Sequence, residues 1–214
     1  MIVEVHELDR AVLLWRVPRG TRAVSTAVVG GGIGSCNWVV NAEVDHDYHR
    51  DPVEHLLEIT AQLRLSGRGA GMVTAAEVKR YASATADRGV HCATTVGLSY
   101  PVFASAPHDE VPRSVGTINT FCWVPVPLED GALVNMVVTA TEAKSQALTE
   151  LDIPGTGTAS DAVVICCPEG PGEQFGGPRS VWGAELARAV HTATLMGARD
   201  WLSRNELKGL WFQG

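Results

Sequence analysis

The feature that most constrains the fold is the repeated alternation of short β-rich runs with helical segments in a chain of 214 residues. Runs of apolar and β-branched residues at 90–96, 115–124 and 162–167 predict strands. Apolar stripes with helical spacing at 132–151 and 182–201 predict two long helices. Elements of both kinds bury one face against the other in layers, so the sequence predicts an α/β (α+β) domain built of sheet and helix layers.

The first third of the chain adds further strands and a shorter helix. Residues 12–15 and 23–29 flank a Pro-Arg-Gly turn and are expected to pair as a hairpin. Residues 38–44 alternate in the manner of a half-buried strand. A helix is expected over 53–63, because a proline stands at its start, where the missing amide hydrogen costs nothing.

Composition and charge narrow the class of protein. Hydrophobic residues make up 45% of the chain and no Pro-rich or highly charged stretch divides it, which predicts one domain over residues 1–208. Residues 209–214 resemble the remnant of an expression tag. The formal net charge is -7, and Lys and Arg are scattered singly, which argues against a nucleic-acid partner.

The N-terminal residues and the cysteines bear on the compartment. Glu4, Glu7 and Asp9 stand where a secretory signal needs positive charge and then apolar residues, and no apolar run reaches the roughly 18 residues of a membrane span. Five irregularly spaced cysteines fit a reducing environment. We therefore expect a cytoplasmic protein without a membrane partner, in which Cys166 and Cys167 are buried strand residues rather than a redox pair.

A glycine-rich segment at 30–34 suggests a loop that approaches a bound anion closely. It lacks the Gly-Lys-Ser/Thr sequence of a phosphate loop, and a strand rather than a helix comes after it. We expect a tight turn or a loop that contacts substrate, with Gly31 and Gly32 at its centre.

Three histidines within ten residues, His46, His49 and His55, form the densest cluster of potential zinc ligands. His46 and His49 lie in a charged turn and lack the spacing of four residues that presents two ligands on one helical face. A solvated loop is the alternative to a zinc site, and we expect no metal.

Lys144 falls on the apolar stripe of the helix expected over 132–151. Glu142 is two residues away and points to a different face, so the two side chains do not pair within the helix. Lys144 either extends from the edge of the core into water or meets a partner in a functional site.

The segment 116–120, Gly-Thr-Ile-Asn-Thr, gains its interest from the elements that come after it in the chain. A strand, a helix carrying Thr-Glu-Ala-Lys at 141–144 and the run Gly-Thr-Gly-Thr-Ala-Ser-Asp at 155–161 stand in that order. In this order and spacing the chain resembles the adenosylcobinamide amidohydrolases from about residue 14 to about residue 197. The matching segments are 30–34, 38–42, 116–119, 130–135, 140–144, 155–163 and 175–178.

The resemblance implies hydrolysis of the amide that joins cobyric acid to aminopropanol, which yields adenosylcobyric acid in corrinoid salvage. It implies a small-molecule corrinoid partner, with the cobalt corrinoid as substrate and no cofactor required. A homodimer is also considered. The substrate-binding residues expected from the matched segments are Gly31, Gly32, Asn41, Thr95, Asn119, Thr156 and Thr158.

A weaker similarity links the chain to the N-terminal-nucleophile aminopeptidases and ornithine acetyltransferases, which cleave themselves before a Ser or Thr. It implies an αββα fold, two sheets sandwiched between helix layers. On this match Thr117 is the nucleophile, Thr95 contacts the oxyanion and Asp161 is the orienting acid.

The chemistry needs a proton acceptor as well as a nucleophile. In an uncleaved chain Thr117 has no free amine, so the expected base is Asp161, Glu142 or Lys144, unless water attacks directly. We expect the bond between Gly116 and Thr117 to stay intact. The alternatives are an autoprocessing aminopeptidase or acyltransferase and a corrinoid-binding protein without catalysis.

Overall fold

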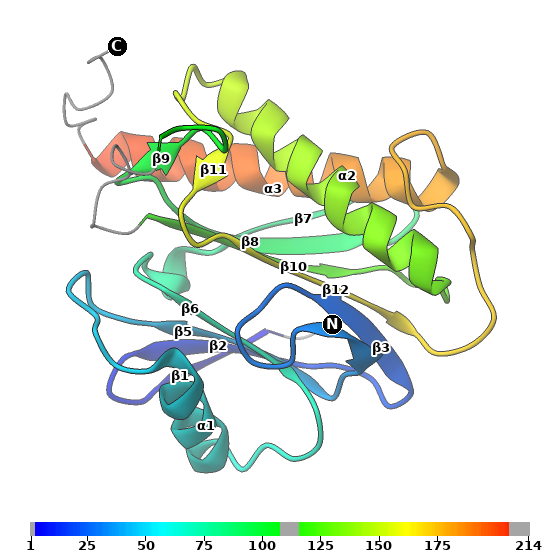
Figure 1. Cartoon of the computed structure of the whole chain (residues 1–214), viewed down its shortest axis with the longest axis horizontal. Helices are drawn as coiled ribbons and strands as arrows, with labels where there is room; N and C mark the ends of the chain where they lie inside the picture. The colour runs from blue at the N-terminus through cyan, green and yellow to red at the C-terminus, as the bar shows by residue number, and fades with distance from the viewer. Residues whose placement is uncertain (1–2, 108–115, 206–214) are drawn as a thin grey trace.

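The computed structural model describes residues 3–107 and 116–205, so the interpretation of 209–214 as a tag remnant lies outside the described residues. Two β-sheets are stacked face to face, with α1 on the outer face of one sheet and α2 and α3 on the outer face of the other (Figure 1). The expected layered fold, helix–sheet–sheet–helix, is confirmed. The helices are α1 (Pro52–Gln62), α2 (Asp130–Thr149) and α3 (Val181–Arg204).

The smaller sheet has four strands in the order β1-β2-β5-β6. Its strands are β1 (Val3–Glu7), β2 (Ala11–Arg16), β5 (Trp38–Glu43) and β6 (Ala70–Thr74). Helix α1 connects β5 to β6, which run parallel, as a crossover between parallel strands requires. Strand β2 is apolar from Ala11 to Trp15 because Leu13 and Trp15 face the other sheet while Val12 and Leu14 pack beneath α1.

The larger sheet has six strands in the order β4-β3-β12-β10-β8-β7. These are β4 (Gly32–Ser35), β3 (Thr21–Ser25), β12 (Ala162–Pro168), β10 (Thr117–Trp123), β8 (His91–Gly97) and β7 (Ala82–Thr85). The central strands β10 and β12 are parallel, and helix α2 lies between them in the chain. The short strands β9 (Pro101–Val102) and β11 (Gly157–Thr158) pair beside them, and η1 (Val78–Arg80) is a single helical turn.

The expected hairpin between residues 12–15 and 23–29 is wrong. Strand β2 pairs with β1 and β5, whereas β3 pairs with β12 and β4 in the other sheet. The Pro-Arg-Gly turn therefore connects the two sheets. Strand β2 is apolar on both faces, so it is buried between a helix on one side and the other sheet on the other side. The hairpin partner of β2 is β1, whose alternating polar residues suit the edge of a sheet.

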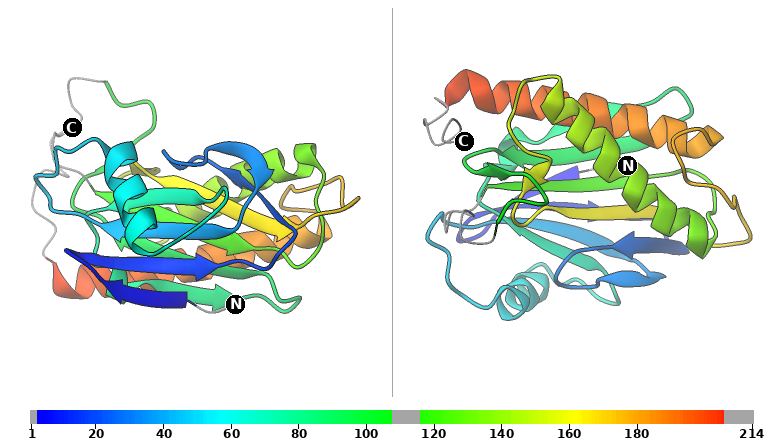
Figure 2. Two further views of the ribbon diagram at one scale, coloured as in Figure 1. Left: turned by 90° about the horizontal axis from the view of Figure 1, so that it is seen from below. Right: turned by 45° about the horizontal axis from the view of Figure 1, so that its top comes forward.

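Figure 2 shows the two sheets and the helices as separate layers. Apolar side chains fill the spaces between them, and two of these apolar layers are larger than the one beneath α1. One fills the space between the sheets, where Trp15 and Phe121 pack with ring centroids 4.8 Å apart. The other lies between the larger sheet and helices α2 and α3. Cys166 belongs to the first layer and Cys167 to the second, so adjacent thiols point to opposite faces of β12, and both are buried and free, as expected.

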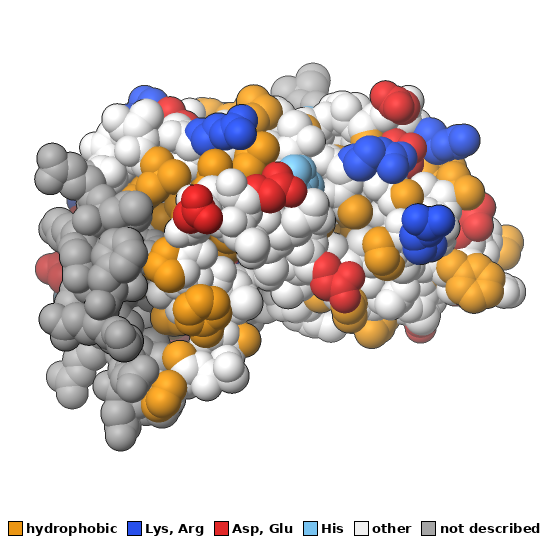
Figure 3. Space-filling view, turned by 90° about the horizontal axis from the view of Figure 1, so that it is seen from above, with side chains coloured by type: hydrophobic (Ala, Val, Ile, Leu, Met, Phe, Trp, Pro, Cys, Tyr) orange, Lys and Arg blue, Asp and Glu red, His pale blue; other side chains and the backbone are white. Residues whose placement is uncertain are grey.

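Burial has a chemical consequence for one of these thiols. It raises the pKa of Cys167, which therefore stays protonated and weakly nucleophilic at neutral pH. On the face seen from above in Figure 3, apolar side chains are interspersed with charged ones rather than gathered into one continuous patch. Within residues 3–107 and 116–205, no helix combines the length and the apolar character needed to cross a membrane.

Candidate active site

The candidate site lies at one end of the space between the sheets, where strand β10 begins. Alternate residues of a strand share a face, so Thr117 and Asn119 face the smaller sheet together with the core residue Phe121. Thr117 is only 2% exposed. The sequence brings a hydroxyl group to the inner end of a central strand, where packing fixes its position.

Thr117 contacts a serine that the sequence analysis did not select. Its Oγ1 lies 2.8 Å from Ser160 Oγ, and the Ser160 hydroxyl donates to the Gly116 carbonyl oxygen at 3.2 Å. Because the Ser160 proton is committed to that carbonyl, the Thr117 hydroxyl donates to Ser160. The nucleophile candidate is thus held by one hydroxyl partner on the turn before β12.

Asp161 fixes this arrangement. Its carboxylate accepts from the backbone N–H of Ile118 at 2.9 Å and of Thr158 at 3.1 Å. It also accepts from the Thr158 hydroxyl and from Lys144 Nζ. Four donors occupy the lone pairs of the two carboxylate oxygens, so Asp161 orients the start of β10 and has no free lone pair to take the Thr117 proton.

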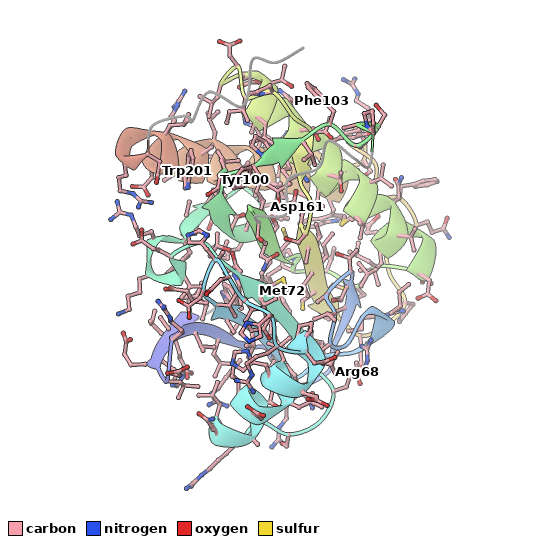
Figure 4. The ribbon with its side chains drawn as sticks, turned by 60° about the vertical axis from the view of Figure 1, so that its left-hand side comes forward. Arg68, Met72, Tyr100, Phe103, Asp161 and Trp201 are labelled. Atoms are coloured by element: carbon pink, nitrogen blue, oxygen red, sulfur yellow. The ribbon has the colours of Figure 1, made fainter. Side chains whose placement is uncertain are left out.

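Lys144 reaches Asp161 from helix α2. The side chains of the pair are 11% and 12% exposed, so the ammonium ends in an ion pair and does not extend into water. Gly157 lies against both groups, and a β-carbon there would overlap them. In Figure 4, Asp161 lies near the helix layer, on the same side as Tyr100, with Met72 and Arg68 in the other half of the molecule.

Three more of the predicted residues form a buried network across the two sheets. Asn41 of β5 donates from Nδ2 to the Thr95 hydroxyl oxygen of β8 at 2.9 Å. Asn119 donates from Nδ2 to Asn41 Oδ1 and to the Val73 carbonyl oxygen, both at 2.9 Å. The three side chains are 1–2% exposed. The structure therefore brings Asn41, Thr95 and Asn119 together beside Thr117.

Thr117 also lines a pocket with a cavity volume of about 100 Å³. Its wall combines apolar groups with the ion pairs between α3 and η1, in which Arg80 bonds to Asp200 and Arg204 bonds to Glu77. Its other lining residues are His46, Ala75, Ala76, Val96, Gly97, Ser99, Gly197, Trp201 and Asn205. The pocket gives a short, partly polar group access to the Thr117 end of the site.

The hydrogen bond from Arg80 lowers the pKa of Asp200 to about 2, with Arg204 acting in the same direction. This carboxylate stays ionised at any ordinary pH, so the charges at the pocket wall remain balanced.

Other predicted site residues lie apart from this cluster. Glu142 is exposed on α2, on a different face from Lys144. Gly31 and Gly32 are exposed where the chain enters β4, and Gly32 begins that strand, so the segment is partly an edge strand rather than a loop. Thr156 is exposed and its hydroxyl oxygen accepts from the Ala104 N–H at 3.1 Å.

The glycine-rich segment has a partner of its own. Arg68 Nη2 donates to the carbonyl oxygens of Gly30 at 2.9 Å and Gly31 at 3.1 Å, and Nη1 donates to Ser35 O at 2.9 Å. Gly30 has a φ of +73°, and a β-carbon there would overlap the backbone of Gly69. The glycines thus allow a close approach between the two sheets.

The three histidines have separate neighbours. His46 lines the pocket beside Thr117, and His49 Nδ1 lies 3.2 Å from the Asp47 carbonyl oxygen. His55 stacks on Tyr48, and burial lowers its pKa. In the part of the chain that the structure describes, no three His, Cys, Asp or Glu side chains are grouped to hold a metal ion.

Sequence reasoning missed Ser160, Gly157 and the pocket position of His46. The first two stand in the Gly-Thr-Gly-Thr-Ala-Ser-Asp run, where closely spaced glycines before an acid signal a turn that wraps a polar group. His46 is exposed in a turn, as the sequence predicted, but the sequence did not show that this turn meets strand β8 and helix α3 at the pocket.

The fold and the site define a class: layered α/β proteins with a buried hydroxyl, an Asp–Lys pair and an asparagine network at one end of the space between two sheets. Within it, the chain belongs to the adenosylcobinamide amidohydrolase family, whose model matches residues 2–206. The family resemblance found in the sequence is thereby confirmed.

Two relatives show how close the similarity is. The chain is 27% identical over 179 residues to an adenosylcobinamide amidohydrolase of Methanosarcina mazei, a match covering 78% of this chain and 85% of that protein. It is 32% identical over 94 residues to an uncharacterized protein of Methanocaldococcus jannaschii, covering 40% of this chain and only 37% of that relative's length. The likeness to the Methanosarcina protein thus extends over most of both chains.

Proposed function

We propose that the protein hydrolyses adenosylcobinamide at the amide between cobyric acid and aminopropanol, releasing adenosylcobyric acid for corrinoid salvage. The observation that carries this proposal is the Thr117 hydroxyl, buried beside Ser160 and open to a small pocket. The cobalt corrinoid enters as substrate, and no metal or other cofactor is required.

The pocket size supports a role for the short arm of the substrate. A cavity of about 100 Å³ has room for a group the size of aminopropanol but none for a corrin ring. Apolar walls from Ala76, Val96 and Trp201 suit its methyl group, and the polar wall suits its hydroxyl. The macrocycle then stays outside the pocket and only its amide-linked arm enters.

In the proposed reaction, Thr117 Oγ1 attacks the amide carbon and forms an ester to the chain. The C–N bond breaks, and the aminopropanol nitrogen leaves with a proton as the neutral amine. Water then adds to the ester, which releases the carboxylic acid and restores the threonine hydroxyl. Asp161 and Lys144 position the start of β10 and take no proton in these steps.

The proton of Thr117 needs an acceptor other than Asp161, whose lone pairs are occupied. His46 lines the same pocket, and a neutral imidazole has one ring nitrogen that can accept a proton. We therefore favour His46 over Glu142, because both side chains are exposed but the lining of the Thr117 pocket includes His46 and not Glu142. Replacing His46 with Gln should lower kcat about 100-fold, whereas an unchanged kcat would contradict the role of His46 as the base and leave direct attack by water as the alternative.

The deciding experiment incubates the purified protein with adenosylcobinamide and detects adenosylcobyric acid and aminopropanol by mass spectrometry. Product should form, and the activity should persist after exhaustive chelation of metal ions. Absence of product would overturn the proposed activity. Activity that vanishes on chelation and returns only with zinc would overturn the metal-free mechanism.

One observation favours a second candidate, an autoprocessing aminopeptidase or acyltransferase. The Ser160 hydroxyl donates to the carbonyl oxygen of the peptide bond between Gly116 and Thr117, the bond that such enzymes cut. We propose that this bond stays intact, and intact-mass measurement tests it. A fragment beginning at Thr117 would support the second candidate, and tight corrinoid binding without product would support a non-catalytic binding protein.

We further propose a cytoplasmic protein that binds no nucleic acid. A homodimer remains part of the proposal, and light scattering after size exclusion tests it. A mass of one chain, 22.8 kDa, would contradict the dimer.

A further inference from the structure

The contact between Thr117 and Ser160 continues the register of the larger sheet. Strand β12 begins opposite Asn119 of β10. One residue earlier, the Ile118 N–H donates to the Asp161 carboxylate, and one residue before that, the Thr117 hydroxyl lies against Ser160. Both contacts join residues 43 apart in the chain. Side chains of the turn thus replace the missing part of β12, and the sheet holds Ser160 against Thr117.

The Ser160 hydroxyl has two acceptors within reach. Its Oγ is 3.2 Å from the Gly116 carbonyl oxygen and 2.8 Å from Thr117 Oγ1. Hydrogen bonds between an O–H group and an oxygen are usually about 2.5–3.0 Å long, so the bond to Gly116 is long and the distance to Thr117 is ideal. A hydroxyl carries one proton and turns it to suit its neighbours. Turning the Ser160 proton from Gly116 to Thr117 therefore costs little.

The two directions of the Thr117 contact differ in where the Thr117 proton points. At rest, Thr117 donates to Ser160, so its proton is turned away from the pocket that His46 lines. A base in the pocket needs this proton turned toward it. When Ser160 turns its own proton to Thr117 Oγ1, the Thr117 proton is released from the contact and can point into the pocket. The second direction is therefore the one that suits attack.

The second direction also places a donor on the attacking oxygen. Negative charge develops on Thr117 Oγ1 as its proton leaves, and a hydroxyl that donates to a charged oxygen forms a stronger hydrogen bond than one between neutral groups. Thr117 is 2% exposed, so water has little access to stabilise this charge. The Asp161 carboxylate is an acceptor and adds no donor. Ser160 supplies one at 2.8 Å.

We propose that Ser160 is a further catalytic residue, which turns its hydroxyl proton from the Gly116 carbonyl oxygen to Thr117 Oγ1 during attack. This inference rests on the proposed amide hydrolysis. The Thr117 O–H bond breaks, its proton goes to a ring nitrogen of His46, and Oγ1 bonds to the amide carbon. Ser160 keeps its own proton throughout, and Thr117 Oγ1 regains a proton when water hydrolyses the ester. Donors aimed at developing charge contribute on the order of 100-fold or more in rate.

The first test replaces the Ser160 hydroxyl. Ser160→Ala should lower kcat about 100-fold with KM less affected, while folding is nearly unchanged because the side chain is exposed. Ser160→Thr keeps the hydroxyl and should retain substantial activity. Ser160→Cys keeps the size with a weak donor, so its kcat should fall between those of the Thr and Ala variants. The control Thr149→Ala removes another exposed hydroxyl that donates to a backbone carbonyl oxygen, and it should keep wild-type kcat.

The second test asks whether Ser160 acts through the Thr117 oxygen. In Thr117→Ala this oxygen is missing, so adding Ser160→Ala should lower kcat no further. A merely structural role of Ser160 would instead multiply the two losses. Circular dichroism verifies that each variant is folded, and the Thr and Cys variants decide the role of the hydroxyl even if Ser160→Ala does not fold.

The outcomes separate this inference from the proposed function. If wild type hydrolyses adenosylcobinamide and Ser160→Ala keeps more than about a tenth of wild-type kcat, the role of Ser160 is overturned while the proposed function stands. The same holds if Ser160→Cys keeps wild-type kcat, if Ser160→Thr is as slow as Ser160→Ala, or if the losses multiply in the double variant. If wild type itself gives no product, the proposed function is overturned, and with it the role of Ser160 in that reaction.

Discussion

The space between the sheets differs from one end to the other. In its middle, Trp15 and Phe121 form an apolar contact with no polar group to satisfy except the Trp15 indole N–H. At the β10 start, Asn41, Thr95 and Asn119 fill the same layer with hydrogen bonds, and Thr117 lies next to them. One face of strand β10 spans both regions. The Phe121 end of this face contributes to stability, and the Thr117 end belongs to the candidate site.

The largest effect should come from the apolar region. Phe121→Ala removes a side chain that is 0% exposed, and the cavity should cost about 4 kcal/mol in the free energy of unfolding. Chemical denaturation measures this loss. Activity per folded molecule should change little, with Phe121→Leu as the milder control. If turnover falls while stability holds, the division between the two regions is wrong.

The next largest effect should come from the buried ion pair between Lys144 and Asp161, because it contributes to stability and also positions the candidate site. Lys144→Met leaves the Asp161 carboxylate with its three uncharged donors and no counter-ion, at a cost of about 3 kcal/mol. The double variant with Asp161→Asn removes both charges and should recover part of the loss. Unfolding curves of the two single variants and the double variant give the coupling. Strict additivity would contradict a direct ion pair.

Thr117→Ala tests the polar region. It should lower kcat/KM by about 100-fold, or about 2.7 kcal/mol in the barrier, while costing only about 1 kcal/mol of stability. Thr117→Ser keeps the hydroxyl and should retain substantial activity. Steady-state kinetics with adenosylcobinamide measure both. Retention of more than about a tenth of wild-type activity in the alanine variant would exclude Thr117 as nucleophile or key donor.

The smallest effect concerns the pocket wall. The pKa of Asp200 is lowered in the folded state to about 2, so its stabilising contribution is present above about pH 4, the range of an unfolded aspartate, and is lost as pH falls toward 2. Its side chain is 36% exposed, so the contribution should be well below about 1 kcal/mol. Thermal unfolding of wild type and Asp200→Asn between about pH 2 and 5 should converge in acid. A constant difference would contradict the ion pair.

The sequence predicted element types better than it predicted partners. The helix expected over 182–201 is α3 at Val181–Arg204, because an apolar stripe is a local property. The pairing of β2 failed because alternation within a strand does not say which strand lies next to it. Lys144 was found on the apolar stripe, but its partner Asp161 is 17 residues away in the chain.

The candidate site was predictable only in part for the same reason. Thr117, Asp161, Asn41 and Thr95 were named by resemblance, and the structure places them at one end of the two sheets. Asn41 and Asn119 meet across 78 residues of sequence, which no spacing rule covers. Ser160 was missed because nothing in the sequence distinguishes a serine in a polar turn until its contact with Thr117 of strand β10 is known.

The four donors to Asp161 have a consequence for how the molecule folds. They come from β10, α2 and β11, and the most distant of them, the Ile118 N–H, is 43 residues from Asp161 in the chain. Burying the Asp161 carboxylate before all four donors are in place is unfavourable. We therefore expect folding to begin in the apolar layers of the domain. We therefore expect the site to form late in folding, so that a newly made chain becomes active only after its apolar layers have packed.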